Sequence, residues 1–422
     1  MEKQLIKQIV LEQREEIKKI FEEKIIEREV EKKARKMLET NLIKVIIGPR
    51  RCGKSVLAYR LVKDKKYGYI NFDDERLIGI KTNDLNSCLE VLEEINPGFK
   101  YLLLDEVQNV RGWELFVNRL KRSGYNIVIT GSNSKLLSKE LATHLTGRHF
   151  IIELFPFSFR EFLSYQDFQV KKEDIFITQK RARIKKFFNE YLKSGGFPEV
   201  MKLELKKQYL RELYDKIISR DILSRYGIKY IKDLKEIALF AISNFGSKVS
   251  YHKIKNLFEI KSVHTAKNYL NYLEEAYLIF QLLPFSFKIK NQLRQSKKLY
   301  TIDTGLINAI APKFSPDTGK LMENLVFLEL KRQGKEIYFY SQPIGYEVDF
   351  VIREGLRIKQ LIQVCYSVAR EETKKREIKG LLRTGRDLIC NNLLVITSDY
   401  EGEERIKNKK IKYIPLWKWL LK

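Results

Sequence analysis

The sequence has few of the residues that build metal sites and disulfide frameworks, with only four cysteines and four histidines among 422 residues. Cys52, Cys88, Cys365 and Cys390 are scattered along the chain, and no two of them have the spacing of paired metal ligands. The histidines are equally dispersed. We therefore expect neither a structural zinc ion nor a disulfide framework.

The sequence also lacks long apolar runs. A membrane-spanning helix needs roughly 18 or more consecutive apolar residues, and no stretch approaches that length. The N-terminus is charged from Glu2 onward and has no continuous apolar segment of the kind found in secretory signals. These absences predict a soluble cytoplasmic protein with no membrane partner.

Acidic residues are outnumbered, because 54 Asp and Glu stand against 80 Lys and Arg and give a formal net charge of +26. Such an excess favours a partner with many negative charges, and DNA or another nucleic acid is expected ahead of an anionic membrane surface. The alternative is the Lys-rich surface of a heat-adapted protein, although Glu does not balance the Lys here. The hydrophobic share of 44% leaves ample material for cores, and the length suggests about three domains.

One glycine-rich stretch stands between the two elements that a phosphate-binding P-loop requires. Residues 42–47 form a short β-branched apolar run, which is typical of a buried parallel strand. Residues 56–62 have apolar side chains at helical spacing and predict a helix. The predicted nucleotide-binding residues are Gly48, Pro49, Arg50, Arg51, Cys52, Gly53, Lys54, Ser55 and Val56.

Each special residue of this loop has a physical role in the P-loop template. Gly48 and Gly53 let the backbone curl, so that successive N–H groups and the helix N-terminus face one anion. Lys54 is expected to reach the β- and γ-phosphates, and Ser55 to place its hydroxyl on Mg²⁺. Arg50 and Arg51 add two positive charges that either strengthen phosphate binding or contact a partner.

A second apolar strand, residues 101–104, ends in the adjacent carboxylates Asp105 and Glu106, the arrangement called Walker B. A parallel strand would carry both acids to the edge of the sheet beside the P-loop. Asp105 is expected to hold Mg²⁺, and Glu106 to orient the attacking water. The alternative is that the two acids cap a helix beginning near Val107.

Two further groups are candidates for sensing or stabilising the phosphates. Thr130, Ser132 and Asn133 end another apolar strand, and one of them is a plausible γ-phosphate sensor unless the segment is a simple turn. Arg148 follows Thr146 and Gly147, and its fixed charge and planar donors suit an arginine finger. The alternative for Arg148 is an ordinary surface arginine.

The order of strands and motifs up to Arg148 resembles the AAA+ superfamily. It looks most like predicted archaeal and bacterial ATPases that join an AAA+ core to a C-terminal nuclease-like domain of undefined role. The resemblance extends over nearly the whole chain, through residues 154–163, 194–199, 303–306, 323–324 and 347–349.

The resemblance implies ATP and Mg²⁺ at the P-loop and Asp105, hydrolysis assisted by Glu106, and Arg148 acting in trans on a neighbouring subunit. Self-association follows from it, with a hexameric ring as one possible form. Asn71 falls where AAA+ proteins keep a polar residue that can restrain the catalytic Glu. In the helical lid that follows the core we find no convincing second sensor, and Arg220 and Arg225 are guesses.

Residues 230–290 predict three helices, 233–245, 250–258 and 262–277, followed by two short strands at 278–283 and 287–290. This is the pattern of a winged helix-turn-helix. In that reading the third helix contacts bases and the wing contacts phosphate. The contacting residues would be His264, Lys267, Asn268, Lys288 and Lys290. Such units also serve as protein-interaction modules, and the charge favours nucleic acid.

The last segment matches part of a restriction-endonuclease-like pattern. Glu323 on a helix and Asp349 on a strand fit its metal-binding acids, but Gln363 and Cys365 replace the Glu and Lys of the following strand. Losing an anionic ligand and a cation together removes both metal affinity and charge stabilisation. We therefore expect a degenerate nuclease fold that is retained for binding or assembly.

The predicted fold class is α/β: a P-loop AAA+ core with a parallel sheet and a helical lid, a winged-helix domain, and a C-terminal α/β restriction-endonuclease-like domain. The predicted boundaries are 1–40 for a charged helical segment, 41–165 for the core, 166–228 for the lid, 229–292 for the winged helix and 293–422 for the last domain. The segment 1–40 either contacts a partner or packs on the chain's own core.

The leading functional prediction is an AAA+ ATPase that hydrolyses ATP with Mg²⁺ and acts on DNA through its basic C-terminal half. The first alternative is an ATP-gated DNA-binding or regulatory module with little turnover. The second is an active ATP-dependent nuclease.

Overall fold

The computed structural model describes residues 1–422 apart from 133–146, 313–316, 343–344, 369–370 and 407. The chain divides into two compact units, Met1–Phe157 and Ser158–Lys422. The predicted core, 41–165, ends near this boundary, and the structure groups the predicted lid with the C-terminal half.

The first unit is built on a parallel five-stranded sheet in the order β2-β3-β4-β1-β5. Its strands are short and consist mainly of buried apolar residues, as expected for a parallel sheet covered on both faces. All neighbouring pairs run in the same direction. The strands are β1 (Ile43–Ile47), β2 (Tyr67–Asn71), β3 (Tyr101–Asp105), β4 (Asn126–Gly131) and β5 (His149–Glu153).

Helices cover both faces of this sheet and enclose two separate cores. On one face α1, α4 and α5 pack against alternate strand residues such as Val45 and Leu104. On the other face α2 and α3 pack against the intervening residues, such as Ile46 and Leu103. The elements are α1 (Lys3–Ile20), α2 (Glu31–Leu38), α3 (Lys54–Val62), η1 (Glu75–Leu77), α4 (Asp84–Ile95), η2 (Val107–Asn109) and α5 (Trp113–Arg122).

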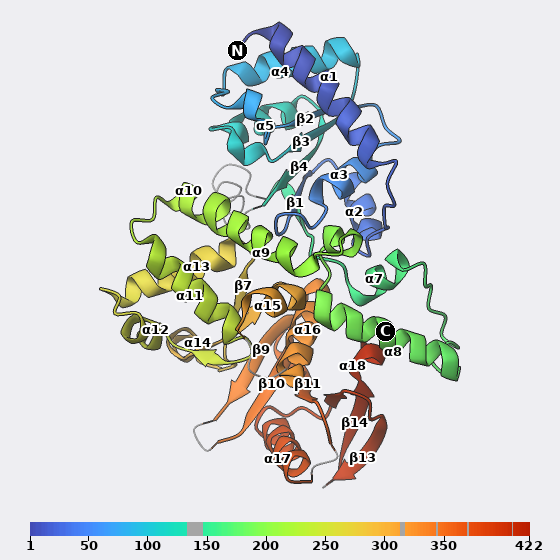
Figure 1. Ribbon diagram of the computed structural model, residues 1–422, viewed down its shortest axis with the longest axis vertical. Helices are drawn as coiled ribbons and strands as arrows, with labels where there is room; N and C mark the ends of the chain where they lie inside the picture. Colours follow the sequence, from blue (N-terminus) through green and yellow to red (C-terminus); the bar gives the residue numbers. More distant parts are fainter. Residues whose placement is uncertain (133–146, 313–316, 343–344, 369–370, 407) are drawn as a thin grey trace. The chain divides into compact units, whose positions relative to one another are not determined.

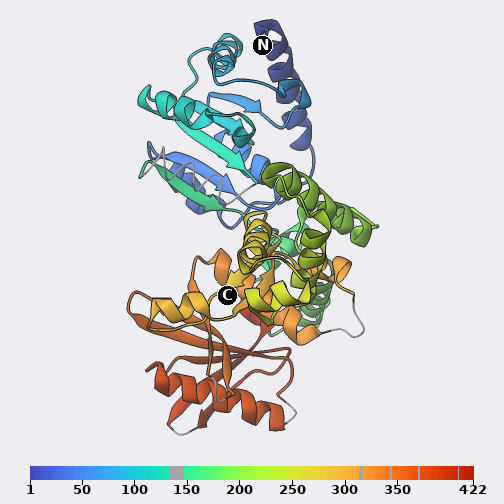
Figure 2. The ribbon, with the colours of Figure 1, turned by 90° about the vertical axis from the view of Figure 1, so that its left-hand side faces the viewer.

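The predicted charged helical segment at 1–40 forms two helices, α1 and α2, and α1 lies beside α4 in both ribbon views (Figures 1 and 2). Ile6, Ile9 and Val10 are buried in the core that α4 and the sheet share. The apolar stripe of α1 therefore packs on the chain's own core, which was the second of the two interpretations of this segment.

We predict that Ile9→Ala lowers the free energy of unfolding by about 2–4 kcal/mol, because Ile9 is fully buried and its truncation leaves a cavity. Leu11→Ala on the same helix is the control, since Leu11 is 44% exposed and its loss should change stability by less than about 0.5 kcal/mol. Urea unfolding followed by circular dichroism measures both. Equal effects of the two substitutions would contradict the packing of α1.

The second unit begins with helices that pack on a helix from much later in the chain. Asp303 caps α15 and also accepts a hydrogen bond from the Gly196 N–H at 2.6 Å. A β-carbon on Gly195 would lie 2.0 Å from the Asp303 carboxylate, and one on Gly305 2.1 Å from the Ser194 carbonyl oxygen, so both positions require glycine. The motifs at 194–199 and 303–306 are thus two sides of one contact.

The helices of this part follow the predicted pattern. They are α7 (Phe159–Tyr165), α8 (Thr178–Ser194), η3 (Pro198–Lys202), α9 (Lys206–Lys216), η4 (Ile217–Leu223), α10 (Ser224–Tyr226) and α15 (Thr304–Ile310). Arg220 and Arg225 lie on η4 and α10. Their sensor role stays a prediction.

Three helices and a three-stranded sheet follow, in the sheet order β6-β8-β7. The three predicted helices and the first predicted strand are present. The elements are α11 (Ile231–Ser243), β6 (Lys248–Val249), α12 (Tyr251–Leu257), α13 (Val263–Glu275), β7 (Ile279–Leu282), α14 (Ile289–Arg294) and β8 (Lys297–Thr301).

The predicted strand at 287–290 is wrong, because helix α14 begins within it and the partner of β7 is β8. Phe287 and Ile289 alternate with lysines, but they are 81% and 69% exposed, so a strand here would bury no apolar face. Strand β8 was missed because it begins with Lys297 and Lys298, which are nevertheless buried.

The C-terminal part is a mixed six-stranded sheet in the order β13-β14-β12-β11-β10-β9. Helix α17 packs against β10 and β11 (Figure 1). Its elements are α16 (Thr318–Arg332), β9 (Glu336–Ser341), β10 (Glu347–Glu354), β11 (Arg357–Cys365), α17 (Glu371–Asp387), β12 (Leu393–Thr397), β13 (Gly402–Ile406), β14 (Lys409–Pro415) and α18 (Leu416–Trp419).

Candidate nucleotide-binding site

The parallel sheet of the first unit brings the predicted loop and acids to one edge. Ile47, the last residue of β1, is in register with Gly131 of β4, and Asp105 of β3 is in register with Asn71 of β2. Because the strands are parallel, the segments that follow them all leave the sheet at the same side. The loop 48–53, the acid pair and Ser132 therefore meet there.

The loop conformation depends on two glycines and one close contact. Gly53 has φ +94° and caps α3, a left-handed conformation that favours glycine. A β-carbon on Gly48 would lie 2.1 Å from the Leu154 carbonyl oxygen, so no larger residue fits. The Lys54 ammonium donates to the Pro49 carbonyl oxygen at 3.1 Å, which places this cation within the curl of the loop. The helix N-terminus and Lys54 together form an anion site.

Asp105 is buried and held by two hydroxyl groups. The Thr130 hydroxyl donates to Asp105 Oδ1, and the Ser55 hydroxyl also hydrogen-bonds to this carboxylate. Burial, followed by the neighbouring Glu106 charge, raises the pKa of Asp105 to about 6 against the two hydrogen bonds that lower it. The carboxylate is therefore short of positive charge, which is the condition in which a divalent cation binds best.

Glu106 is positioned by its backbone and by several partners. It has φ +48°, an uncommon conformation for a residue with a β-carbon, and its N–H donates to the Thr130 hydroxyl oxygen at 3.0 Å. Its carboxylate lies 3.7 Å from the Lys54 ammonium and accepts from the Gln108 amide and the Ser132 N–H. Burial alone would raise the pKa of Glu106, but Lys54 and these hydrogen bonds lower it. Glu106 is thus held as an anion next to an Asp105 carboxyl whose pKa is raised.

The donor set at this edge fits a magnesium-bound nucleoside triphosphate. One carboxylate and one hydroxyl, Asp105 and Ser55, already touch each other, and Mg²⁺ typically takes one or two such ligands and completes its shell with water and phosphate oxygens. Among the described residues, no group of three or more His, Cys, Asp or Glu side chains is placed to hold a metal ion, so a cage made of protein ligands alone is absent there.

The sensor and loop predictions have mixed outcomes. Thr130 and Ser132 both touch the acid pair, whereas Asn133 lies outside the described residues, as does Thr146. The side-chain oxygen of Asn71 accepts from the Asp73 N–H at 3.0 Å, and the amide that contacts Glu106 is that of Gln108. Gln108 was missed, although it stands two residues after the acid pair.

Arg50 of the loop lies close to an acid. Its guanidinium lies 3.5 Å from the Asp73 carboxylate, which follows β2. Arg51 is exposed and has φ +65°. The contribution of both arginines to nucleotide affinity stays a prediction.

Arg28 is a second residue that the sequence did not reveal. Its buried guanidinium donates to the Cys52 carbonyl oxygen at 2.8 Å and to the Phe155 carbonyl oxygen at 2.6 Å, and it stacks on the Phe157 ring at 4.9 Å. It therefore ties the P-loop to the segment after β5. The only signal was an arginine in a segment already rich in charge.

Arg148 is not part of this constellation. It immediately precedes β5, and its carbonyl oxygen accepts from the Ile43 N–H at the start of β1. The P-loop follows the other end of β1, five residues later, which is about 16 Å along a strand. The exposed Arg148 thus lies at the opposite edge of the sheet from the P-loop of its own chain.

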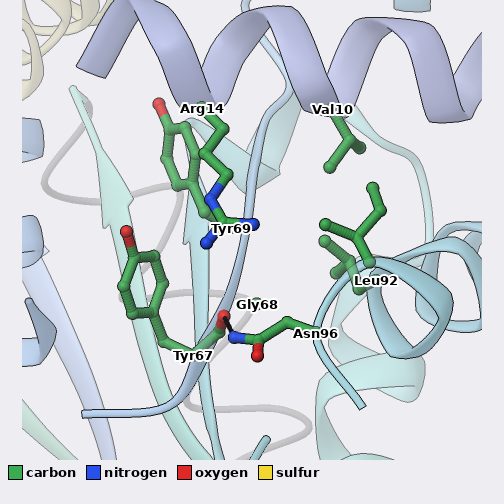
Figure 3. A pocket seen from close by; sticks show the side chains of 8 residues that line it. Val10, Arg14, Tyr67, Gly68, Tyr69, Leu92 and Asn96 are labelled. Carbon is green, nitrogen blue, oxygen red and sulfur yellow. Dashed lines mark hydrogen bonds between the residues drawn. The ribbon is translucent and has the colours of Figure 1, made fainter. Parts of the chain in front are cut away.

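A small hollow elsewhere in the first unit is not the nucleotide site. It lies between α1, the edge strand β2 and α4 (Figure 3). The Asn96 amide at its rim donates to the Tyr67 carbonyl oxygen at 2.9 Å. The lining residues are Val10, Arg14, Tyr67, Gly68, Tyr69, Leu92, Ile95 and Asn96, none of which belongs to the P-loop or the acid pair.

Among the helices that the structure describes, none combines the length and the apolar character that crossing a bilayer demands.

Comparisons with known proteins divide the chain into three matched regions. Residues 40–163 match the family described as AAA domain, 185–317 match Domain of unknown function (DUF8612), and 318–419 match Domain of unknown function (DUF4143). The predicted AAA domain is thereby confirmed. The winged-helix and endonuclease-like assignments stay predictions.

Two relatives match nearly end to end. The chain is 42% identical to the uncharacterized protein MJ1544 of Methanocaldococcus jannaschii, covering 99% of this chain and 95% of that protein. It is 33% identical to an uncharacterized protein of Haemophilus influenzae, covering 90% and 94%. Among solved structures, it is similar to the Walker-type ATPase paby2304 of Pyrococcus abyssi, with 15% identity, a TM-score of 0.44 and coverage of 68% and 96%.

The raised pKa of Asp105 predicts an acid limit to magnesium-dependent nucleotide binding. Protonated Asp105 cannot ligate Mg²⁺, so the affinity for Mg·ADP should fall about tenfold per pH unit below pH 6. Fluorescence titrations with a labelled ADP, run with Mg²⁺ and with EDTA, separate this loss from the titration of the nucleotide itself. Asp105→Asn should show no magnesium-specific loss of affinity as the pH falls. An Mg·ADP affinity that is flat between pH 7 and pH 5 would contradict the assignment.

Arg28→Ala should weaken Mg·ADP binding about tenfold or more, because two charge-assisted hydrogen bonds that hold the loop are lost. Arg28→Lys should retain part of the affinity, since it keeps the charge but not the two-pronged geometry. Lys33→Ala, at an exposed position of α2, is the matched control. A folded Arg28→Ala protein with wild-type affinity would show that the loop does not need this support.

Proposed function

Because this chain belongs to the same family as the uncharacterized protein MJ1544 and carries an AAA domain, we propose that it is an ATPase that hydrolyses ATP with Mg²⁺ and acts on DNA. The observation that carries the proposal is the convergence of Lys54, Ser55, Asp105 and Glu106 at one edge of the parallel sheet. A cation for phosphate, two ligands for Mg²⁺ and an acid for water are the parts that phosphoryl transfer to water requires.

The contact between Lys54 and Glu106 supports a sequence of events on nucleotide binding. The Lys54 ammonium is shared between the Pro49 carbonyl oxygen and the Glu106 carboxylate. A triphosphate carries more negative charge than either partner and would draw Lys54 toward its β- and γ-oxygens. Glu106 would then keep the Gln108 amide and the Ser132 N–H as partners and be available to accept a proton from water.

The position of Arg148 supports a role in trans. An exposed arginine at the edge opposite the chain's own P-loop cannot stabilise phosphoryl charge there, whereas it can reach a nucleotide held by a neighbouring copy. A planar, permanently charged guanidinium suits that task. Self-association is therefore part of the proposal, and Arg148 is its proposed catalytic contribution.

The order α11-β6-α12-α13-β7-β8 with sheet order β6-β8-β7 supports a winged helix-turn-helix in the C-terminal half. His264 and Lys267 are exposed on α13, and the Asn268 amide hydrogen-bonds to the His264 ring at 3.2 Å. These side chains form a polar, cationic helix face of the kind that enters a major groove.

The segment between β7 and β8 takes the place of the wing. Lys288, Lys290 and Arg294 are exposed in or beside α14. The cations suit contacts to phosphate, which supply affinity without reading sequence. Residues 287–290 do not form a strand, and Lys288 and Lys290 are exposed and available for that role.

The order α16-β9-β10-β11-α17-β12 supports an endonuclease-like fold at the C-terminus, with Glu323 on α16, Asp349 on β10 and Gln363 on β11. The Gln363 oxygen accepts from the Asp349 N–H at 3.2 Å, and its amide donates to Glu377 at 2.7 Å. Both polar atoms of the Gln363 side chain thus hydrogen-bond to neighbouring groups of the protein. We propose that this domain is used for binding or assembly and does not cut DNA.

Lys54→Ala should abolish magnesium-dependent ATP hydrolysis, and Glu106→Gln should bind ATP but turn it over at least about 100-fold more slowly. Steady-state phosphate release measures turnover, and filter binding measures ATP retention. Undiminished hydrolysis by Lys54→Ala would remove the proposed site. Negligible wild-type turnover together with nucleotide-dependent DNA affinity would favour an ATP-gated regulatory module instead.

Lys267→Ala should weaken binding to duplex DNA and reduce the slope of log affinity against log salt by about one, because one phosphate or base-edge cation is lost. Lys375→Ala on α17 is the control, since this exposed lysine lies in the endonuclease-like part and pairs with Glu371. Fluorescence anisotropy over a salt series measures both. Identical curves for wild type and Lys267→Ala would place the DNA contact elsewhere.

A further inference from the structure

A buried lysine occupies the centre of an acidic cluster in the C-terminal half. Lys298 of β8 is only 3% exposed, and its ammonium lies 2.7 Å from Glu323, 2.8 Å from Glu347 and 2.8 Å from Asp349. Glu323 comes from α16, and the other two acids come from β10. An ammonium group has three N–H donors, so three carboxylates satisfy it completely.

The remaining contacts of the acids are also made by the protein. The Tyr300 hydroxyl donates to Glu323 at 2.6 Å, and the Val364 N–H donates to the second oxygen of Asp349 at 2.9 Å. Lys248 of β6 pairs with Glu347 at 2.9 Å. Each acid of the cluster is therefore bonded to other groups of the protein as well as to the Lys298 ammonium at the centre.

The charges of the cluster approach balance. Three carboxylates and the Lys298 ammonium sum to −2, and Lys248 brings the sum to −1. Burial, followed by the Asp349 charge, raises the pKa of Glu323, so this carboxyl takes up a proton more readily than an ordinary Glu. Burial alone would lower the pKa of Lys298, but Asp349, Glu323 and Glu347 hold it well above its usual value. Lys298 therefore stays charged throughout the physiological range.

The position of this cation bears on what the domain can do. A helix acid and a strand acid that converge in an α/β fold of this kind are arranged to hold a divalent metal ion. Here the Gln363 side-chain oxygen accepts from the Asp349 N–H, and its nitrogen donates to Glu377. The third carboxylate of the cluster comes from Glu347. The ammonium lies where the acids converge, which is the place a metal ion would need.

We propose that Lys298 is a resident cation that replaces a divalent metal ion in the cluster of Glu323, Glu347 and Asp349. The lysine closes the cluster to Mg²⁺ and Mn²⁺. Because Lys298 and Lys248 belong to the three-stranded sheet and the acids to α16 and β10, the same contacts fasten the three-stranded sheet to the C-terminal fold. This inference is independent of ATP hydrolysis and of DNA binding.

The test is Mn²⁺ binding by the full-length, nucleotide-free protein, followed by electron paramagnetic resonance. Wild type should show no site at the cluster. Lys298→Met, which keeps most of the side-chain volume, should gain one Mn²⁺ per chain with an affinity at least about tenfold above any background that wild type shows. Lys298→Met combined with Asp349→Asn is the matched control and should lose the gained site, while any binding at the P-loop stays the same in all three proteins.

Thermal melting in the absence and presence of millimolar Mn²⁺ gives a second readout. Lys298→Met should melt below wild type without metal, because three carboxylates are left without their cation, and Mn²⁺ should recover the lost stability. If Lys298→Met does not fold without metal, the version that also carries Glu347→Gln removes one surplus charge and serves for the same titration.

Four results would overturn the proposal. Wild type could bind Mn²⁺ in a manner that Asp349→Asn abolishes, or cut plasmid DNA in a manner that Asp349→Asn abolishes. Folded Lys298→Met could bind no more Mn²⁺ than wild type. Failure to fold even with Mn²⁺, both in Lys298→Met and in the version that also carries Glu347→Gln, would also overturn it, because a divalent ion should replace the ammonium.

Discussion

The backbone of the P-loop approaches the chain after β5 so closely that only glycine fits at position 48, and the site depends on this contact. The Leu154 carbonyl oxygen that would meet a Gly48 β-carbon at 2.1 Å also accepts a hydrogen bond from the Cys52 thiol at 3.4 Å. Arg28 fastens the same two segments from the protein side. The loop is thus held by contacts within the protein itself, and such preorganisation lowers the entropy lost on binding.

The two acidic sites of this chain differ in how their negative charge is balanced. In the first unit Asp105 and Glu106 share one nearby ammonium, that of Lys54, and the pKa of Asp105 is raised. That edge has a deficit of positive charge which a divalent cation can fill. In the second unit the ammonium groups of Lys298 and Lys248 pair with the carboxylates, so the balancing positive charge comes from the chain itself. Similar acids therefore produce a ligand-dependent site in one unit and a structural cluster in the other.

The sequence predicted the parts of the site that local patterns encode. The P-loop, the acid pair and Thr130 each follow an apolar strand, and parallel pairing brings them together as expected. Arg28 and Gln108 could not be predicted, because their roles depend on tertiary contacts and neither belongs to a spaced motif.

The same limit explains the errors in the C-terminal half. Alternation at 287–290 indicated a strand, but both apolar side chains of that stretch are exposed. Strand β8 was missed because it begins with two adjacent lysines. Lys298 is buried together with acids from α16 and β10, which lie far along the sequence. Charge pairing across such distances leaves no periodic pattern.

The central claim is that the curled loop and the acid at the tip of β3 jointly hold one metal-bound nucleotide. Isothermal titration calorimetry of Mg·ATP into wild type and into Gly48→Ala tests it most directly. We expect one nucleotide per wild-type chain and an affinity at least about tenfold weaker in a folded Gly48→Ala protein, because the loop must move away from Leu154. Absence of binding heat in wild type, or unchanged affinity in Gly48→Ala, would contradict it.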